Sequence, residues 1–262
     1  MAHEHCFVFG CQRSGTTALT RLLHSHEAVV MGVERYKYRL TNRRGRRSFD
    51  ASWYEPERFL EFRPGDTNID PHAGQFTEHY ARAERKLRRG GVRYVGDKVP
   101  LGRRVTRTLE RRLPEPRFLF IYRDPLRVAG SFAARARDPE DRNWPVSDDH
   151  EVAIARWHRS FEIADGLTDR IGIDRVLAVK YERLFDPADL TARDAVFNFL
   201  GLDVTPVVQR HFAARTENWD ERRSRPLAMP VDEERRLDAM IDHGVRTRFD
   251  CRSEEQLEHL TR

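Results

Sequence analysis

Short runs of consecutive apolar residues alternate along this chain with segments whose apolar residues recur every three or four positions. The runs predict buried strands at 6–9, 28–31, 92–95, 118–122 and 176–179. The recurring pattern predicts helices over 16–24, 75–88, 101–113, 154–167 and 192–200, with a further helix after Pro125. Strands that alternate with helices are typical of an α/β fold with a central parallel β-sheet flanked by helices.

The remaining stretches are polar and fit neither pattern. We expect one domain over 1–262, with a loop-rich insertion at about 35–75 that contains a short helix near 56–61. Residues 138–151 are rich in acids and predict an exposed loop. A charged, mostly helical segment is expected at about 202–262.

The junction between the first strand and the first helix carries a candidate phosphate-binding loop. Residues 10–17 read Gly-Cys-Gln-Arg-Ser-Gly-Thr-Thr. Loops that bind nucleoside triphosphates read G-x-x-x-x-G-K-[ST], and their lysine reaches the β- and γ-phosphates. Here Thr16 takes the lysine position and the cation lies earlier, at Arg13. Backbone N–H groups, hydroxyls and Arg13 can cradle a phosphate, but the pattern disfavours hydrolysis of ATP or GTP with magnesium.

A second phosphate contact is predicted at the end of the most apolar strand. Arg123 follows the strand at 118–122, and ligands of parallel sheets bind at the carboxyl ends of the strands. Ser131 lies eight residues later, about two helical turns along the next helix. An arginine and a serine in these places are suited to hold a second phosphate.

Composition sets limits on the remaining possibilities. The formal net charge of +5 over 262 residues fits an anionic cofactor or substrate and does not by itself indicate nucleic acid. Cys6, Cys11 and Cys251 are scattered, so neither a disulfide framework nor a zinc site is expected. No apolar run approaches the roughly 18 residues of a membrane span. With a first strand that begins at about residue 5, we expect no signal peptide, no transmembrane anchor and a cytoplasmic location.

Together, the two phosphate motifs resemble those of sulfotransferases that use 3′-phosphoadenosine 5′-phosphosulfate (PAPS). The family's 5′-phosphosulfate loop reads [K/R]-[S/T]-G-[T/S]-[T/S], matched by residues 13–17, and its 3′-phosphate site pairs an arginine with a serine eight residues on. The segments 179–184 and 199–201 resemble later parts of the same family. The resemblance covers roughly residues 5–201 and implies a P-loop nucleotide-kinase-like three-layer sandwich.

The resemblance also implies a reaction and a set of binding residues. A sulfuryl group would pass from PAPS to an acceptor hydroxyl, leaving 3′-phosphoadenosine 5′-phosphate (PAP), with no metal required. Relatives stack the adenine on an aromatic residue where this chain has Ala18, so Tyr181 or Trp219 is expected to cover the base instead. The residues expected to bind the co-substrate are Gln12, Arg13, Ser14, Gly15, Thr16, Thr17, Ala18, Arg123, Ser131 and Tyr181.

Three side chains are candidates for the chemical step. Glu34 follows the second strand, where relatives of the glycan and protein-tyrosine type carry a glutamate base, although an ion pair to Arg35 or Lys37 explains it equally well. Lys98 resembles the family's lysine near the transferring group, and Arg13 is expected to share that stabilising role. No histidine occurs between positions 79 and 150, so the chain resembles the bacterial and glycan-type enzymes rather than the phenol and steroid type.

The acceptor is left open by these patterns. The family implies a hydroxyl of a glycan, a lipid or a small natural product, and the insertion at 35–75 would lie on the acceptor side. Residues 35–47 carry seven basic side chains and no acid, which fits either an acidic acceptor chain or a solvated loop. We expect no nucleic-acid partner. The alternative hypotheses are a phosphate-loop kinase and a non-catalytic module that binds nucleotides or polyanions.

Overall fold

A parallel five-stranded sheet lies at the centre of the molecule. The computed structural model describes residues 3–138, 144, 149–227 and 229–262. The strand order is β2-β3-β1-β4-β5, and every pairing is parallel. The strands are β1 (Cys6–Phe9), β2 (Val29–Val33), β3 (Tyr94–Lys98), β4 (Arg117–Tyr122) and β5 (Val176–Lys180). The predicted α/β fold with a central parallel sheet is therefore confirmed.

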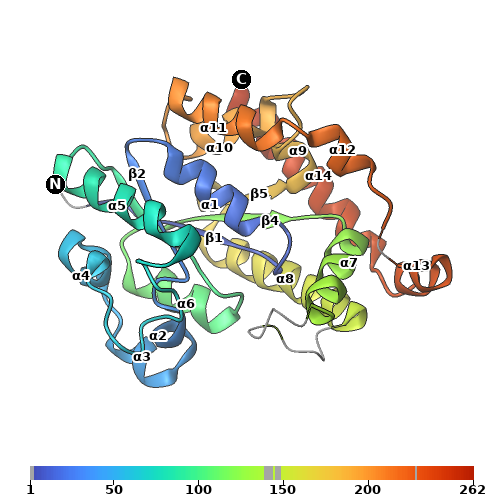
Figure 1. The fold of residues 1–262 in the computed structure, drawn as a ribbon, viewed down its shortest axis with the longest axis horizontal. Coiled ribbons are helices and arrows are strands. Elements are labelled where there is room, and N and C mark those ends of the chain that lie inside the picture. Colours follow the sequence, from blue (N-terminus) through green and yellow to red (C-terminus); the bar gives the residue numbers. More distant parts are fainter. Residues whose placement is uncertain (1–2, 139–143, 145–148, 228) are drawn as a thin grey trace.

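Helices cover both faces of this sheet (Figure 1). The helices that follow the strands are α1 (Thr16–Ser25), α5 (Thr77–Arg89), α6 (Arg103–Arg112), α7 (Pro125–Ala136), α8 (His150–Ile171) and α10 (Thr191–Phe199). Alternate strand residues point to opposite faces, so each face has its own apolar layer. Val8 packs with α1 and α10, whereas Phe7 and Phe9 pack with α6 and α8.

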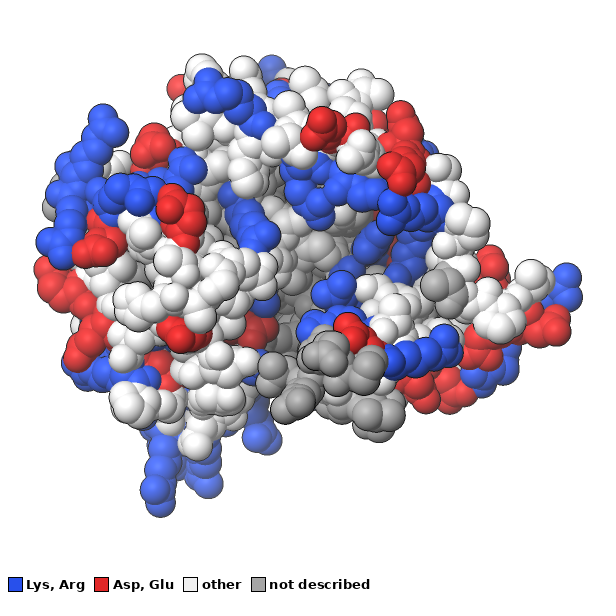
Figure 2. All heavy atoms as spheres, viewed as in Figure 1, with Lys and Arg blue, Asp and Glu red and all other residues white. Residues whose placement is uncertain are grey.

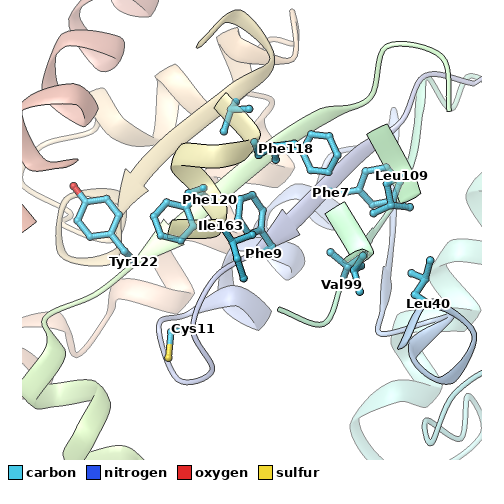
Figure 3. Close-up of a cluster of buried hydrophobic side chains, with 14 of the residues drawn as sticks. Phe7, Phe9, Cys11, Leu40, Val99, Leu109, Phe118, Phe120, Tyr122 and Ile163 are labelled. Atoms are coloured by element: carbon cyan, nitrogen blue, oxygen red, sulfur yellow. The ribbon is translucent and has the colours of Figure 1, made fainter. Parts of the chain in front are cut away.

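Aromatic rings fill the layer between the sheet and α8. Phe9 lies against Phe120 with ring centroids 5.2 Å apart, and Phe161 from α8 meets Phe120 edge-on. Figure 3 shows the row of rings from Phe7 to Tyr122 across β1 and β4. Because the strands are buried on both faces, their sequences are continuously apolar and were readily predicted.

One strand differs from its predicted position. A strand was expected at 92–95, but β3 begins two residues later and ends three residues later, at Lys98. A glycine and an acid inside the strand hide it from a pattern search. Gly96 is required there because a Cβ would lie 1.8 Å from the carbonyl oxygen of Cys6 on β1.

The stretch after β2 contains more helix than predicted. The expected short helix is present as α4 (Pro56–Leu60), and the others are α2 (Lys37–Thr41), α3 (Arg43–Ser48), η1 (Ala51–Tyr54) and η2 (Gly74–Phe76). Arg35 and Asp66, both fully buried, join the two ends of this stretch by a 3.2 Å ion pair. The carboxylate of Asp66 also accepts hydrogen bonds from Arg39 and Arg58. Asp66 therefore binds α2 and α4 together.

The part of the chain after β5 is largely helical. Its elements are α9 (Tyr181–Leu184), α11 (Pro206–Thr216), α12 (Trp219–Ser224), α13 (Val231–Asp238) and α14 (His243–Thr261), with η3 (Ile173–Arg175) before β5. α14 packs against β5 and α10. None of the described helices is both long and apolar enough to cross a membrane. The predicted loop at 138–151 falls mostly outside the described residues, and the division into one domain stays a prediction.

Candidate active site

The loop after β1 leaves the start of α1 open to an anion. Gly15 caps α1 in the left-handed conformation, with φ +93°, and offers no side chain to the first helical N–H groups. Ser14 turns the loop through a backbone hydrogen bond to Cys11, and its fully buried Oγ has no partner among the described residues. Free N–H groups at a helix start, next to an unsatisfied hydroxyl, form an anion-binding cradle.

Tyr181 closes this cradle from the side of β5. A Cβ at Gly15 would lie 2.2 Å from Cδ2 of Tyr181, so the ring rests directly on the glycine. The guanidinium of Arg123 lies over the same ring, 4.6 Å from its centroid. The sequence therefore needs a glycine at position 15 for two reasons, its positive φ and this close approach.

Arg123 and Ser131, the residues predicted to hold a second phosphate, both contact Arg13 of the first loop. Arg123 Nη1 donates to the carbonyl oxygen of Arg13 at 3.4 Å, and Arg13 Nε donates to Ser131 Oγ at 2.8 Å. The two predicted phosphate motifs, more than 100 residues apart in sequence, thus form one cluster of cations and hydroxyls.

Neighbouring residues fix the position of Arg123. Trp157 Nε1 on α8 donates to the Arg123 carbonyl at 2.9 Å, and Glu182 lies 3.7 Å from Arg123 Nε. Burial raises the pKa of Glu182, although the Arg123 charge and main-chain donors oppose this effect. Arg123 Nε is buried and makes no hydrogen bond within the described part of the chain. Arg123 is therefore held in place while its Nε remains able to donate a hydrogen bond to a ligand.

A cavity of about 180 Å³ lies among these residues. It is lined by Arg13, Gly15, Thr16, Thr17, Ala18, Arg123, Tyr181 and Arg215. In Figure 2 the viewed face is hollowed near its centre, and basic side chains border the hollow. Three of the lining residues are arginines and none is acidic, so the cavity suits a phosphate-bearing ligand.

Arg215 on α11 was not predicted for this site. It approaches the Tyr181 hydroxyl at 3.4 Å and brings a third guanidinium to the cavity. No motif surrounds it, and only the packing of α11 against α1 places it there. The basic run at 222–225 does not line the cavity, and its arginines contact Asn218, Asp186 and Glu221.

The remaining predicted binding residues lie around the cavity rather than in it. Gln12 is exposed at the loop tip. Trp219 is buried behind Tyr181, with ring centroids 5.8 Å apart, and does not line the cavity. Of the two aromatic residues considered for the adenine, only Tyr181 reaches the cavity wall.

Glu34 and Lys98 contact each other at the carboxyl edge of the sheet. Lys98 Nζ lies 2.9 Å from Glu34 Oε1, and Lys37 Nζ lies 3.0 Å from Glu34 Oε2. Of the two ion-pair partners considered for Glu34, Lys37 is therefore found, whereas the Arg35 side chain turns inward to Asp66. Glu34 adopts φ +51°, and its N–H donates to the Lys98 carbonyl at 2.8 Å.

The two lysines set the charge state of Glu34. Burial alone would raise the pKa of Glu34, but the charges and hydrogen bonds of Lys98 and Lys37 outweigh burial and lower it. The carboxylate is therefore ionised at neutral pH. Asp97, next to Lys98 in the chain, is fully buried, and its Oδ2 accepts from the main-chain N–H of Arg35 at 2.9 Å.

Strand register explains why these groups lie together. Val33 is paired with Lys98 across β2 and β3, and Val8 is paired with Lys98 across β1 and β3. Glu34, Lys98 and the loop that begins at Gly10 therefore leave the sheet at one edge. Parallel α/β sheets place their ligand sites at this carboxyl edge.

The central parallel sheet flanked by helices, with the Gly15 loop and the Glu34–Lys98 pair at its carboxyl edge, is an α/β fold of the P-loop-like type. Residues 6–206 match the model of the sulfotransferase family. The chain belongs to this family, which confirms the resemblance drawn from the sequence. Membership of this family supports sulfuryl transfer as its general activity. No curated protein matches the chain.

Solved structures share the fold at low sequence identity. The sulfotransferase domain of the curacin biosynthetic pathway is 15% identical, with a TM-score of 0.56, over 91% of this chain and 97% of that domain. The sulfotransferase domain of the Synechococcus PCC 7002 olefin synthase is 16% identical, with a TM-score of 0.54, over 99% and 95%. Mouse sulfotransferase SULT7A1, solved in complex with PAP, is 13% identical, with a TM-score of 0.52, over 96% and 88%.

Proposed function

We propose that this chain transfers a sulfuryl group from PAPS to a hydroxyl group of an acceptor, with PAP and a sulfate ester as products. The observation that carries the proposal is the contact between Glu34 and Lys98, at the sheet edge where the phosphate loop also begins. Family membership and a neighbour solved with PAP support the choice of co-substrate. In this proposal the acceptor hydroxyl belongs to a glycan, a lipid or a small natural product.

The cluster around the cavity fits the phosphates of such a co-substrate. The N–H groups at the start of α1, with the hydroxyls of Ser14, Thr16 and Thr17, would hold the 5′-phosphosulfate. Arg123 and Ser131 would hold the 3′-phosphate. The unsatisfied Ser14 Oγ and Arg123 Nε are donors that this ligand would occupy.

Glu34 acts as the general base in this proposal. Its ionised carboxylate accepts the proton of the acceptor hydroxyl while the acceptor oxygen forms its bond to sulfur and the bond from sulfur to the phosphate oxygen breaks. Lys98, released from Glu34 by the acceptor, stabilises the charge on the sulfuryl oxygens. Arg13 stabilises the charge that develops on the departing phosphate, so the charged groups of the protein cover both ends of the transfer.

Two measurements test the assignment. In a thermal-shift assay, PAP at about 100 times its dissociation constant should stabilise the protein by roughly 2.7 kcal/mol, even in EDTA. PAP release from PAPS, measured with a panel of phenol, alkyl and saccharide alcohols, should fall at least about 100-fold in Glu34→Gln and in Lys98→Met. PAP binding should persist in both variants.

Each competing function predicts a different outcome. Stabilisation by ATP with magnesium, and none by PAP, would indicate a kinase. PAP binding without turnover on any acceptor would indicate a non-catalytic binding module. Full turnover in both variants would show that Glu34 and Lys98 are not the reacting groups.

A further inference from the structure

Arginines make up half of the residues that line two adjoining pockets between α3, α6 and α8. The first has a volume of about 730 Å³ and is lined by Arg46, Arg103, Arg104 and Arg159, among others. The second has a volume of about 240 Å³ and is lined by Arg43, Arg46, Arg47, Arg107, Arg111 and Arg112, with Thr108. Arg46 lines both, and we call the combined surface the basic groove. In Figure 2 basic side chains project at the lower left, where Figure 1 places α3.

The positive charge of the basic groove is almost uncompensated. Glu162 is the one acid that lines it, and it approaches Arg103 only at 3.9 Å, with both side chains more than half exposed. The groove's other arginines form no ion pair with an acid in the described part of the chain. Glu110 is the one acidic residue of α6, and its carboxylate forms an ion pair with Arg170, outside the groove.

This arrangement works against the stability of α6. Five of its ten residues are arginines, and those spaced by three or four positions repel one another along one side. Arg103 and Arg104 also lie at the helix start, where the helix dipole disfavours cations. Burial lowers the pKa of Arg46, and the charges of Arg104 and Arg43 lower it further. A bound anion would relieve all of these repulsions.

The groove begins beside the proposed reaction centre. Lys37, which contacts Glu34, lies one helical turn before Thr41, and Thr41 lines the first pocket. Leu101 and Gly102, three and four residues after Lys98, line the same pocket. A molecule with a hydroxyl at the Glu34–Lys98 pair can therefore extend directly into the arginines.

We propose that the basic groove binds the carboxylate or sulfate groups of an acidic oligosaccharide whose hydroxyl group is the sulfuryl acceptor. This inference rests on the proposed function and names its acceptor class. The planar guanidinium of arginine pairs with carboxylate and sulfate oxygens through two hydrogen bonds. A saccharide supplies hydroxyls and anionic groups at regular intervals, which matches cations distributed along two pockets.

The lining argues against a single-stranded nucleic acid and against a lipid chain as the occupant. No Phe, Tyr or Trp lines either pocket, whereas proteins that bind single-stranded nucleic acids stack the bases on such rings. The apolar lining consists of Leu101, Val105, Ala155 and Ile163 in the first pocket alone, too little to cover a lipid chain.

Binding of labelled oligosaccharides tests the proposal directly. The groove variant combines Arg43→Gln, Arg104→Gln, Arg107→Gln and Arg111→Gln, all at exposed positions without ion pairs to described acids. The control variant combines Arg85→Gln, Arg88→Gln, Arg89→Gln and Arg210→Gln, which removes the same charge outside both pockets. The probes are a hexagalacturonate, a heparin hexasaccharide and neutral maltohexaose, measured by fluorescence anisotropy at low salt with and without PAP.

We expect wild type and control to bind at least one acidic probe, the groove variant to bind it about tenfold more weakly, and maltohexaose not to compete. Equal affinities of the groove and control variants, or no saturable binding of either acidic probe by wild type, would overturn the proposal. Displacement by a thymidine decanucleotide at equal charge concentration would overturn the saccharide assignment. PAP stabilisation is measured separately, so its absence refutes the proposed function while the titrations without PAP still test the groove.

Discussion

Arg13 Nε donates a 2.8 Å hydrogen bond to Ser131 Oγ, across 118 positions of sequence. Arg13 belongs to the loop proposed for the 5′-phosphosulfate, and Ser131 to the site proposed for the 3′-phosphate. Arg13 also has φ +68°, in the left-handed region that non-glycine residues seldom adopt. The arginine is therefore held in one orientation by a residue of the other phosphate site, and the two sites are expected to act together.

The first prediction concerns this coupling. Ser131→Ala and Arg13→Lys should each weaken PAP binding, because one removes a hydroxyl and the other the guanidinium fork. The double variant should lose less than the sum, with a coupling energy of about 0.5–3 kcal/mol. Calorimetric titration with PAP measures all four affinities, and Ser52→Ala, at an exposed position remote from the loop, serves as the control. Strict additivity would show that the hydrogen bond plays no part in binding.

The second prediction concerns the acid limb of the pH–rate profile. Lys37→Met removes one of the two charges that lower the pKa of Glu34, while burial, which raises it, remains. The acid limb of kcat/KM should move to higher pH, with activity near pH 8 largely kept. Arg44→Met, a loss of charge at an exposed position on the neighbouring helix α3, should leave the limb in place.

The same pKa shift has a consequence for stability. The folded-state pKa of Glu34 lies below its ordinary value of 4.5, so its ionised form stabilises the fold above that pH. This contribution is lost as the pH falls through the folded-state pKa. In Lys37→Met this contribution should be smaller and its loss complete at a higher pH, measured by urea unfolding between pH 3 and 6. An unchanged pH dependence of both rate and stability would remove Lys37 from the account of Glu34.

The third prediction concerns the buried ion pair of the insertion. Asp66→Ala leaves the fully buried guanidinium of Arg35 without its carboxylate and also frees Arg39 and Arg58. Loss of one partner of a buried pair costs about 3–5 kcal/mol in free energy of unfolding. Urea denaturation measures this cost. Glu61→Ala breaks only an exposed pair with Arg63 and should leave the midpoint unchanged. A similar midpoint for both variants would contradict the tie between α2 and α4.

The fourth prediction concerns the arginine that sequence patterns did not indicate. Arg215→Met should weaken PAP binding about 10- to 100-fold, since a hydrogen bond from a charged donor contributes about 1.5–3 kcal/mol. Arg210→Met, on the same helix but outside the cavity, is the matched control in the calorimetric titration. Equal affinities in the two variants would exclude Arg215 from the binding site.

The sequence predicted those parts of the fold that local patterns determine. The apolar strand at β4 and the Gly15 turn follow from residue type and spacing alone, and the placement of Arg123 opposite Arg13 follows from the parallel sheet. The family resemblance rested on the same residues. Local patterns were therefore sufficient for most of the sheet and for the turn of the loop proposed to bind phosphate.

The misplaced features depend on contacts between distant segments. β3 was displaced because Gly96 and Asp97 interrupt its apolar run, although the approach of Cys6 requires the glycine. Arg35 was considered as an ion-pair partner of Glu34, but Asp66, thirty-one positions away, draws it into the interior. Arg215 reaches the cavity only through helix packing. None of these contacts leaves a signal in a short window of sequence.

The hydrogen bond from the Glu34 N–H to the Lys98 carbonyl is the last rung of the ladder between β2 and β3. The spacing of the proposed base and cation is thereby set by main-chain geometry, and the connection over 36–93 does not determine it. That connection can lengthen, shorten or be replaced while the reacting pair keeps its dimensions. Diversification toward new acceptors is then modular, provided that a cation equivalent to Lys37 is kept beside Glu34: a transplanted connection would bring a new specificity to the proposed reaction centre.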